Sequence, residues 1–122
     1  MTTTIPTTLS EILTTIGQAA VEVECPIDGF REFATVFRCP TDQMIGFEGR
    51  FPYLAGNRIV YRLMRFRVDS SIIENDRHCS NEDLVGLQSI YVATEADVLN
   101  VLRIWDVSPD TLRQPRETEV PV

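Results

Sequence analysis

His78 and Cys79 stand side by side and are the only neighbours in the chain that pair a base with a thiol nucleophile. A cysteine hydrolase needs its thiol activated by an imidazole within hydrogen-bonding reach. Adjacent residues seldom direct their side chains at each other, and the chain has no second histidine. Zinc would need three or four ligands in a recognisable spacing, and no C-x-x-C pair is present. The pair therefore does not by itself indicate an active site.

Acidic residues crowd the stretch from residue 69 to residue 83, in which Arg77 is the only arginine. They are Asp69, Glu74, Asp76, Glu82 and Asp83. Calcium takes six to eight hard oxygen ligands of this kind and tolerates flexible geometry. The EF-hand pattern is missing, because no glycine lies between Gly56 and Gly86. Calcium bound by these carboxylates is the alternative hypothesis for this stretch, and otherwise no cofactor is expected.

The stretch just before the acidic one has the opposite charge and contains no acid. Its basic residues are Arg50, Arg58, Arg62, Arg65 and Arg67. All 11 basic residues of the chain are arginine, which excludes chemistry that needs a lysine, such as a Schiff base or a P-loop. The two stretches could fold together and neutralise each other. They could instead form separate basic and acidic faces that steer a partner.

The surplus of acid lies in the second half of the chain. Residues 1–68 carry seven acids and seven arginines, whereas residues 69–122 carry eleven acids and four arginines. The net charge of −7 opposes association with phosphates, so nucleic acid is not an expected partner. We expect a non-enzymatic interaction protein, an adaptor, chaperone or inhibitor, that binds a basic protein. The residues expected at that interface are Asp69, Glu74, Asp76, Glu82, Asp83, Arg62, Arg65 and Arg67.

A third hypothesis is an enzyme of unfamiliar type. In it, Arg62, Arg65 or Arg67 would hold an anionic substrate beside His78. The phosphate-binding and hydrolase motifs G-x-G-x-x-G, G-x-S-x-G and H-E-x-x-H are all missing from the chain.

Composition and cysteine usage bound the class of protein. The chain has 122 residues, of which 43% are hydrophobic, so it is expected to form a single globular domain over residues 1–122. No uncharged apolar run approaches the roughly 20 residues that a membrane helix needs. The N-terminus lacks the features of a signal peptide. Three cysteines cannot all be paired within the chain, which is typical of a reducing compartment. The expected location is therefore the cytoplasm, with no membrane contact.

The first half of the chain reads as one helix followed by strands. Apolar spacing predicts a helix over residues 9–18, with Thr8 as its N-cap and Glu11 completing a capping box. Alternating residues predict a β-hairpin from strands 20–25 and 30–39. The same period of two predicts a third strand over residues 43–51.

Residues 58–68 fit either a strand or a helix, and their aromatic and β-branched residues favour a strand. The apolar positions change parity within this segment, so a strand would need a β-bulge near Arg62. Residues 69–83 read as an acidic loop in which Ser80 begins a capped helical turn. Residues 87–93 then read as a strand, followed by a helix capped by Thr94.

This order predicts an α+β fold: an antiparallel meander of about four or five strands, with the N-terminal and C-terminal helices on one face. Antiparallel sheets can leave their other face in water. Such a face, carrying Ala34 and Val36, would offer a surface for a homodimer. Residues 1–7 and 114–122 read as loose tails.

Overall fold

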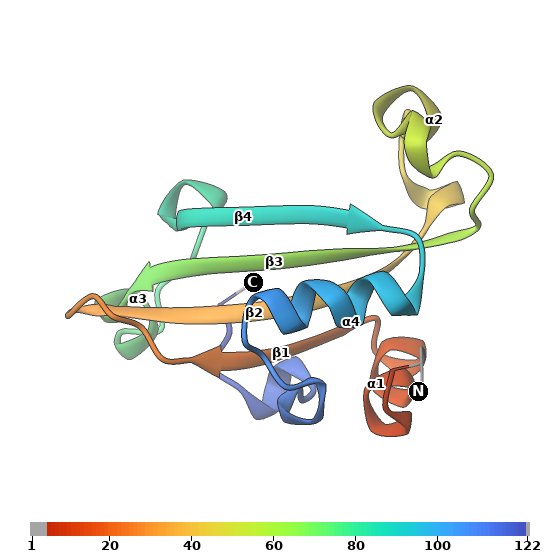
Figure 1. Cartoon of the computed structure of the whole chain (residues 1–122). Coiled ribbons are helices and arrows are strands. Elements are labelled where there is room, and N and C mark those ends of the chain that lie inside the picture. The colour runs from red at the N-terminus through yellow and green to blue at the C-terminus, as the bar shows by residue number, and fades with distance from the viewer. Residues whose placement is uncertain (1–4, 122) are drawn as a thin grey trace.

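A four-stranded antiparallel sheet with strand order β1-β2-β3-β4 forms the centre of the molecule (Figure 1). The computed structural model describes residues 5–121. Helices α1 and α4 flank the sheet, which confirms the predicted α+β meander. The main elements are α1 (Thr7–Thr15), β1 (Gln18–Val23), β2 (Phe30–Pro40), β3 (Ile59–Asp69), β4 (Val85–Val92) and α4 (Glu95–Ile104).

The predicted hairpin is confirmed, with small shifts at its ends. β1 and β2 pair antiparallel from Gln18 opposite Phe37 to Val23 opposite Glu32. β2 and β3 pair over eleven positions without a register shift. These alternating β-branched and aromatic residues suit a pleated strand, in which successive side chains point to opposite faces.

The strand predicted over residues 43–51 is wrong. Residues 41–58 form an excursion that contains helix α2 (Phe47–Arg50) and two turns of 3₁₀ helix, Thr41–Gln43 and Pro52–Leu54. Gly46 takes a left-handed conformation with φ of 67°, which breaks the extended path. Phe47 and Phe51, two of the apolar residues that suggested a strand, pack instead on the beginning of β3, where Phe47 and Leu54 bury Val60. The third, Ile45, is 93% exposed.

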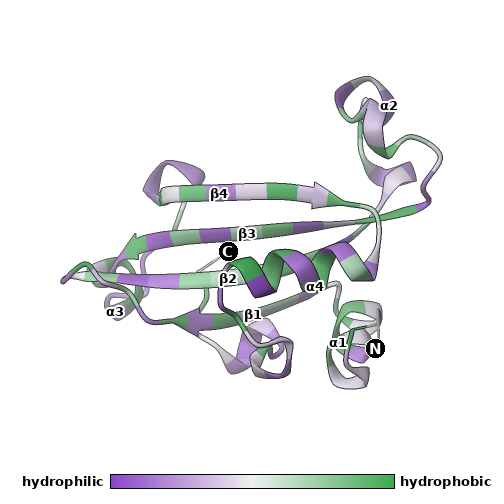
Figure 2. Ribbon diagram, in the orientation of Figure 1, coloured by the Kyte–Doolittle hydropathy of each residue, from purple (hydrophilic) through white to green (hydrophobic). Residues whose placement is uncertain are grey.

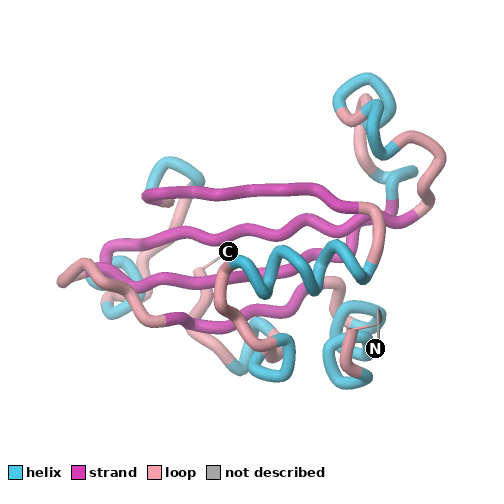
Figure 3. Tube along the Cα trace, in the orientation of Figure 1, coloured by secondary structure: helices cyan, strands magenta, loops and turns pink. Residues whose placement is uncertain are grey.

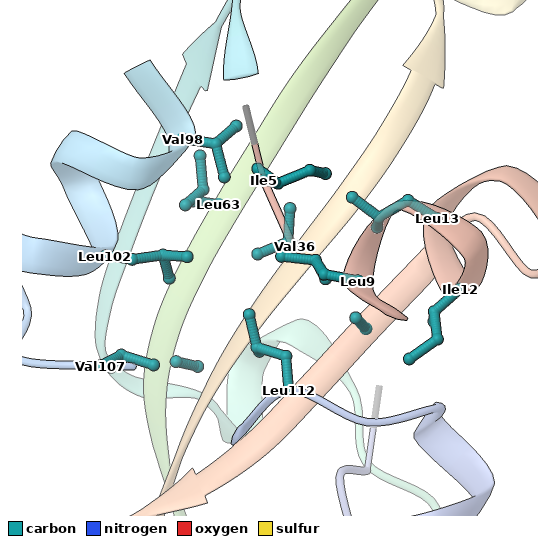
Figure 4. Packing of buried hydrophobic residues seen from close by; sticks show 12 residues of the cluster. Ile5, Leu9, Ile12, Leu13, Val36, Leu63, Val98, Leu102, Val107 and Leu112 are labelled. Carbon is teal, nitrogen blue, oxygen red and sulfur yellow. The ribbon is translucent and has the colours of Figure 1, made fainter. Parts of the chain in front are cut away.

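One face of the sheet lies under the two main helices. Leu9 and Leu13 of α1 and Val98 and Leu102 of α4 meet Leu63 of β3 in a shared core (Figure 4). The cluster also contains Ala34 and Val36, both 0% exposed. The expectation of an exposed face carrying these two residues is therefore wrong, and so is the dimer surface placed there.

The other face is covered as well, over much of its length, by α3 (Ser70–Glu74) and neighbouring segments. The residues buried there are Phe33, Met64, Phe66, Val68 and Ile72. Burial of a sheet on both faces removes the simple alternation of apolar and polar residues. This explains why sequence periodicity alone does not reveal which face is covered.

Burial on both faces also resolves the change of parity in residues 58–68, which form strand β3. Tyr61 and Leu63 lie against the helices, whereas Met64 and Phe66 lie on the opposite face. No bulge is needed near Arg62, and that prediction is wrong. The register shift occurs instead between Arg65 and Arg67 in the pairing with β4, where Gly86 has φ of 63°.

The N-terminal caps of the two main helices differ from each other. Thr94 caps α4 as predicted, because its Oγ1 accepts a hydrogen bond from the backbone N–H of Asp97 at 3.1 Å. The predicted capping box of α1 is wrong: the helix begins after Pro6 and has no side-chain cap. Pro6 lacks the N–H that such a box would satisfy.

Replacing Thr94 by alanine is expected to lower the free energy of unfolding by about 1 kcal/mol, because a backbone donor of α4 loses its partner. Replacing the exposed Thr8 by alanine should change it by less than about 0.5 kcal/mol. Urea unfolding of both variants measures the difference. Equal losses would contradict the assignment of the two caps.

The C-terminal segment passes round the edge of β1, mostly as loop (Figure 3). Leu112 is buried in the helix-side core, and Arg113 forms a backbone bridge with Ala20 of β1. Glu119 then pairs with Arg31 at 3.0 Å, and Val120 packs on the opposite face. The predicted tail 114–122 therefore makes specific contacts up to Val120, and Val122 lies outside the described residues.

At the other terminus, the predicted tail 1–7 is described from Ile5 onwards. Ile5 is buried against α1 and α4, and its backbone N–H donates to Glu95 at 3.0 Å.

Candidate functional site

The acid-rich segment 69–83 lies at one end of the sheet. β3 ends at Asp69, which pairs with Phe30 at the beginning of β2, and β4 begins close by with Val85 opposite Arg67. The turn between β1 and β2, residues 24–29, lies at this same end, since the N–H of Ser70 donates to the carbonyl of Gly29 at 2.9 Å. We refer to residues 24–29 and 69–83 together as the acidic end.

Two of the five predicted acidic residues act as local caps. Asp69 accepts a hydrogen bond from the N–H of Ser71 at 2.9 Å, and Asp83 accepts one from the N–H of Ser80 at 2.8 Å. These backbone hydrogen bonds are the main reason that the pKa of each carboxyl is lowered. Both groups therefore stay ionised at neutral pH while they hold the segment in shape.

The other three predicted acidic residues, Glu74, Asp76 and Glu82, are exposed. Among the described residues, no ion pair involves any of them. The hairpin turn adds two exposed acids, Glu24 and Asp28, that sequence reasoning did not assign to the site. The available signal was the hairpin itself, because antiparallel pairing returns the end of β3 to the β1–β2 turn.

The arginines of β3 do not neutralise the acidic end. The Nε of Arg67 donates to Glu32 at 2.7 Å, and the Nε of Arg65 donates to the second oxygen of the same carboxylate. Arg65 also donates to the carbonyl of Trp105 at 2.7 Å, which ties β3 to the end of α4. The idea that residues 50–67 and 69–83 neutralise each other therefore has no ion pair to support it among the described residues.

Glu32 of β2 is the functional-looking carboxylate that sequence reasoning missed. Its side chain lies on the helix-covered face and is buried there, with only 3% of the residue exposed. Burial raises its pKa, but the hydrogen bonds from Arg65 and Arg67 outweigh this effect, and the net shift is downward. Opposite charges across the β2–β3 register, Glu32 facing Arg67, were the signal that could have found it.

Arg62 lies apart from the other two predicted arginines. Its position in β3 places it on the opposite face from Arg65 and Arg67. Its Nε donates to the hydroxyl of Ser89 at 3.1 Å, and its guanidinium lies 5.6 Å from the ring centroid of Tyr91. The eight predicted interface residues therefore do not form one surface: the acids share an end of the sheet, and the arginines divide between its two faces.

The structure does not bring Arg65 or Arg67 together with His78, as the enzyme hypothesis required. Arg65 and Arg67 line a pocket of about 310 Å³ next to Trp105, on the helix-covered face. His78 lines a different pocket of about 610 Å³ with Cys79 and Val120, on the other face. The thiol of Cys79 donates weakly to the carbonyl of Ser80 at 3.7 Å, and burial raises its pKa, with Asp83 adding to the effect. A raised pKa keeps a thiol protonated and unreactive.

The calcium alternative lacks a set of ligands. Among residues 5–121, no three or more histidine, cysteine, aspartate or glutamate side chains gather closely enough to hold a metal ion. The carboxylates of Asp69 and Asp83 accept hydrogen bonds from the backbone N–H groups of Ser71 and Ser80, so each is engaged at the start of its own short helix. The calcium hypothesis receives no support from this arrangement.

Comparison of the chain with protein-family models, with curated proteins and with solved structures found no match. Within the described residues, no helix combines the length and the hydrophobicity needed to cross a membrane. Within residues 5–121, the acidic end is the part of the molecule where Glu74, Asp76 and Glu82 are exposed without an ion pair.

Proposed function

We propose that this chain is a non-enzymatic interaction protein that binds a basic protein partner through its acidic end. The observation that carries the proposal is the exposure of Glu74, Asp76 and Glu82 at one end of the sheet, without an ion pair among the described residues. The nearest cluster of basic residues in the sequence lies in β3, and its Arg65 and Arg67 pair with Glu32 instead.

The structure of residues 69–83 favours a fixed binding surface over a flexible solvated loop. Asp69 and Asp83 cap the two short helices of the segment, so the backbone between them has defined turns. Ile72 and Ile73 anchor α3 to the buried cluster beneath the sheet. The exposed carboxylates are thus held on an anchored segment, which lowers the entropy lost on binding.

A surface of this kind acts mainly through long-range attraction. Clustered charge of one sign raises the rate at which an oppositely charged partner is captured, and salt screens the effect over about 10 Å at 0.1 M ionic strength. A lysine-rich and arginine-rich peptide is therefore a suitable probe, and its binding should weaken steeply as salt is added.

Neutralising the acidic end tests the proposal. The variant carries Asp28→Asn, Glu74→Gln, Asp76→Asn and Glu82→Gln, and it leaves the capping residues Asp69 and Asp83 in place. Exposed charge pairs contribute about 0.2–1 kcal/mol each, so the loss of four should lower the affinity for the basic peptide by about fourfold or more. Fluorescence anisotropy at low and moderate salt measures the change.

A matched control separates a surface from net charge. The control carries Glu11→Gln, Glu48→Gln, Asp97→Asn and Asp110→Asn, at exposed positions outside the acidic end. It therefore changes the net charge of −7 by the same amount as the first variant. This control should retain most of its affinity. Equal losses in the two variants, or binding that persists at high salt, would show that the acidic end is not a binding surface.

A further inference from the structure

β4 forms an open edge of the sheet, on the side away from β1 (Figure 1). Its first six residues are all exposed, and Val85, Leu87 and Ile90 have 46%, 44% and 42% of their surface accessible. The hydropathy colouring shows hydrophobic bands along this strand (Figure 2). Its sequence, VGLQSIYV, contains neither a charge nor a proline.

Natural edge strands usually carry devices that prevent pairing with another chain, such as lysine, proline or a cover from a neighbouring segment. The β1 edge has such protection: Ala20 and Arg113 exchange backbone hydrogen bonds of 2.9 Å, and Glu22 lies nearby on the strand. β4 has only the bulge at Gly86, close to its beginning. Within residues 5–121, no segment pairs with its outer side.

We propose that β4 pairs antiparallel with β4 of a second copy of this chain, joining the two sheets into one. When a two-fold axis relates the two strands, both copies use the same strand edge, and the free backbone groups of each pair with those of the other. Because β4 carries no charged side chain, the pairing places no like charges directly opposite each other. A basic strand would fit less well, because Arg62 and Arg65 of β3 flank β4 from the two faces.

The distribution of charge along the sheet favours the antiparallel orientation. The acidic end lies where β4 begins, whereas the excursion 41–58 packs against Tyr91 and Ala93 where β4 ends. The excursion has balanced charge, with Arg50 and Arg58 exposed beside Asp42 and Glu48. Antiparallel pairing therefore sets each acidic end beside a neutral end and keeps the two acidic ends far apart.

The same pairing would set a further exposed apolar side chain beside the end of the partner's β4. Ile104, at the end of α4, is 69% exposed and lines the same pocket as Gly86 and Gln88 of β4. A two-fold axis perpendicular to the sheet leaves both α4 helices on one face, so the two Ile104 side chains would lie on the same side of the joined sheet. Burial of apolar surface beside a strand ladder is a common way to stabilise sheet augmentation.

Sedimentation equilibrium of the full chain over rising concentration tests the proposal. We expect a monomer–dimer equilibrium, and the double variant Leu87→Lys plus Ile90→Lys should weaken dimerisation at least about tenfold. The control Ile16→Lys changes an exposed isoleucine beside β1 and should leave dimerisation unchanged. A chain that stays monomeric up to about 1 mM, or a control that dissociates equally, would overturn the proposal.

Hydrogen exchange on the unaltered chain gives a second readout that does not depend on the folding of a variant. The backbone amides of residues 87–92 that point away from β3 should exchange more slowly as concentration rises, whereas amides of β1 should not change. Dimerisation without this protection would place the interface elsewhere and also overturn the proposal. The inference is independent of the proposed function, because the acid-neutralised variant should dimerise normally and the lysine variant should still bind the basic peptide.

Discussion

Replacing Glu32 by alanine is expected to lower the free energy of unfolding by about 2–4 kcal/mol. The substitution leaves the guanidinium groups of Arg65 and Arg67 without their shared counter-charge in a largely buried setting. Loss of one partner of a buried pair costs about 3–5 kcal/mol, and the partial exposure of the two arginine side chains, 23% and 32%, reduces this cost. Urea unfolding followed by circular dichroism measures the loss.

The control for Glu32 is Glu22, whose pair with Arg31 lies at the surface. Glu22→Ala should cost less than about 1 kcal/mol, because water and salt screen an exposed pair. A similar loss for both substitutions would mean that burial does not govern the Glu32 cluster.

The cluster also predicts a dependence of stability on pH. The hydrogen bonds from the two arginines leave the pKa of Glu32 below its ordinary value of 4.5 despite the opposing effect of burial. The unfolded chain therefore binds a proton more readily than the folded chain at this position, and stability from Glu32 is complete above about pH 4.5 and is lost as pH falls through the lowered value. The difference in unfolding free energy between the unaltered chain and Glu32→Gln should shrink in that acid range and stay constant at higher pH.

Replacing Phe33 by alanine is expected to lower the free energy of unfolding by about 3–5 kcal/mol. Phe33 is fully buried on the face of the sheet away from α1 and α4, and its ring centroid lies 5.9 Å from that of Phe66. Removal of the ring leaves a cavity beside Phe66 on this face of the sheet, which the close-packed surroundings can fill only in part. Thermal and urea unfolding both report the loss.

The matched control for Phe33 is Tyr53, an aromatic residue on the excursion that is 68% exposed. Tyr53→Ala should change the free energy by no more than about 0.5 kcal/mol. A small effect of Phe33→Ala would mean that this second face of the sheet is not a true core.

Local signals in the sequence predicted elements well where they were self-contained. The alternation in residues 20–25 and 30–39 encoded a hairpin, and Thr94 encoded the start of α4, because each signal acts within a few residues of its own backbone. The same signals failed over residues 43–51, where Phe47 and Phe51 fit the period of a strand but pack against Val60 and Tyr91 from a helix and a turn.

The charge pattern likewise predicted the acidic end but not what happens to the arginines. Proximity in sequence suggested that Arg65 and Arg67 could meet the acids of 69–83, yet side chains within a strand project sideways and not along the chain. The register of β2 with β3 brought Glu32, more than thirty residues away, to both guanidinium groups.

Sequence patterns were enough to predict the class of fold, the order of most elements and the accumulation of carboxylates in the second half, because these depend on local propensity and on composition. Tertiary structure alone decided which faces are covered, which charges are paired and which strand edge is left open. Those outcomes depend on strand register and on where the C-terminal segment packs, and both arise from contacts between residues far apart in the chain.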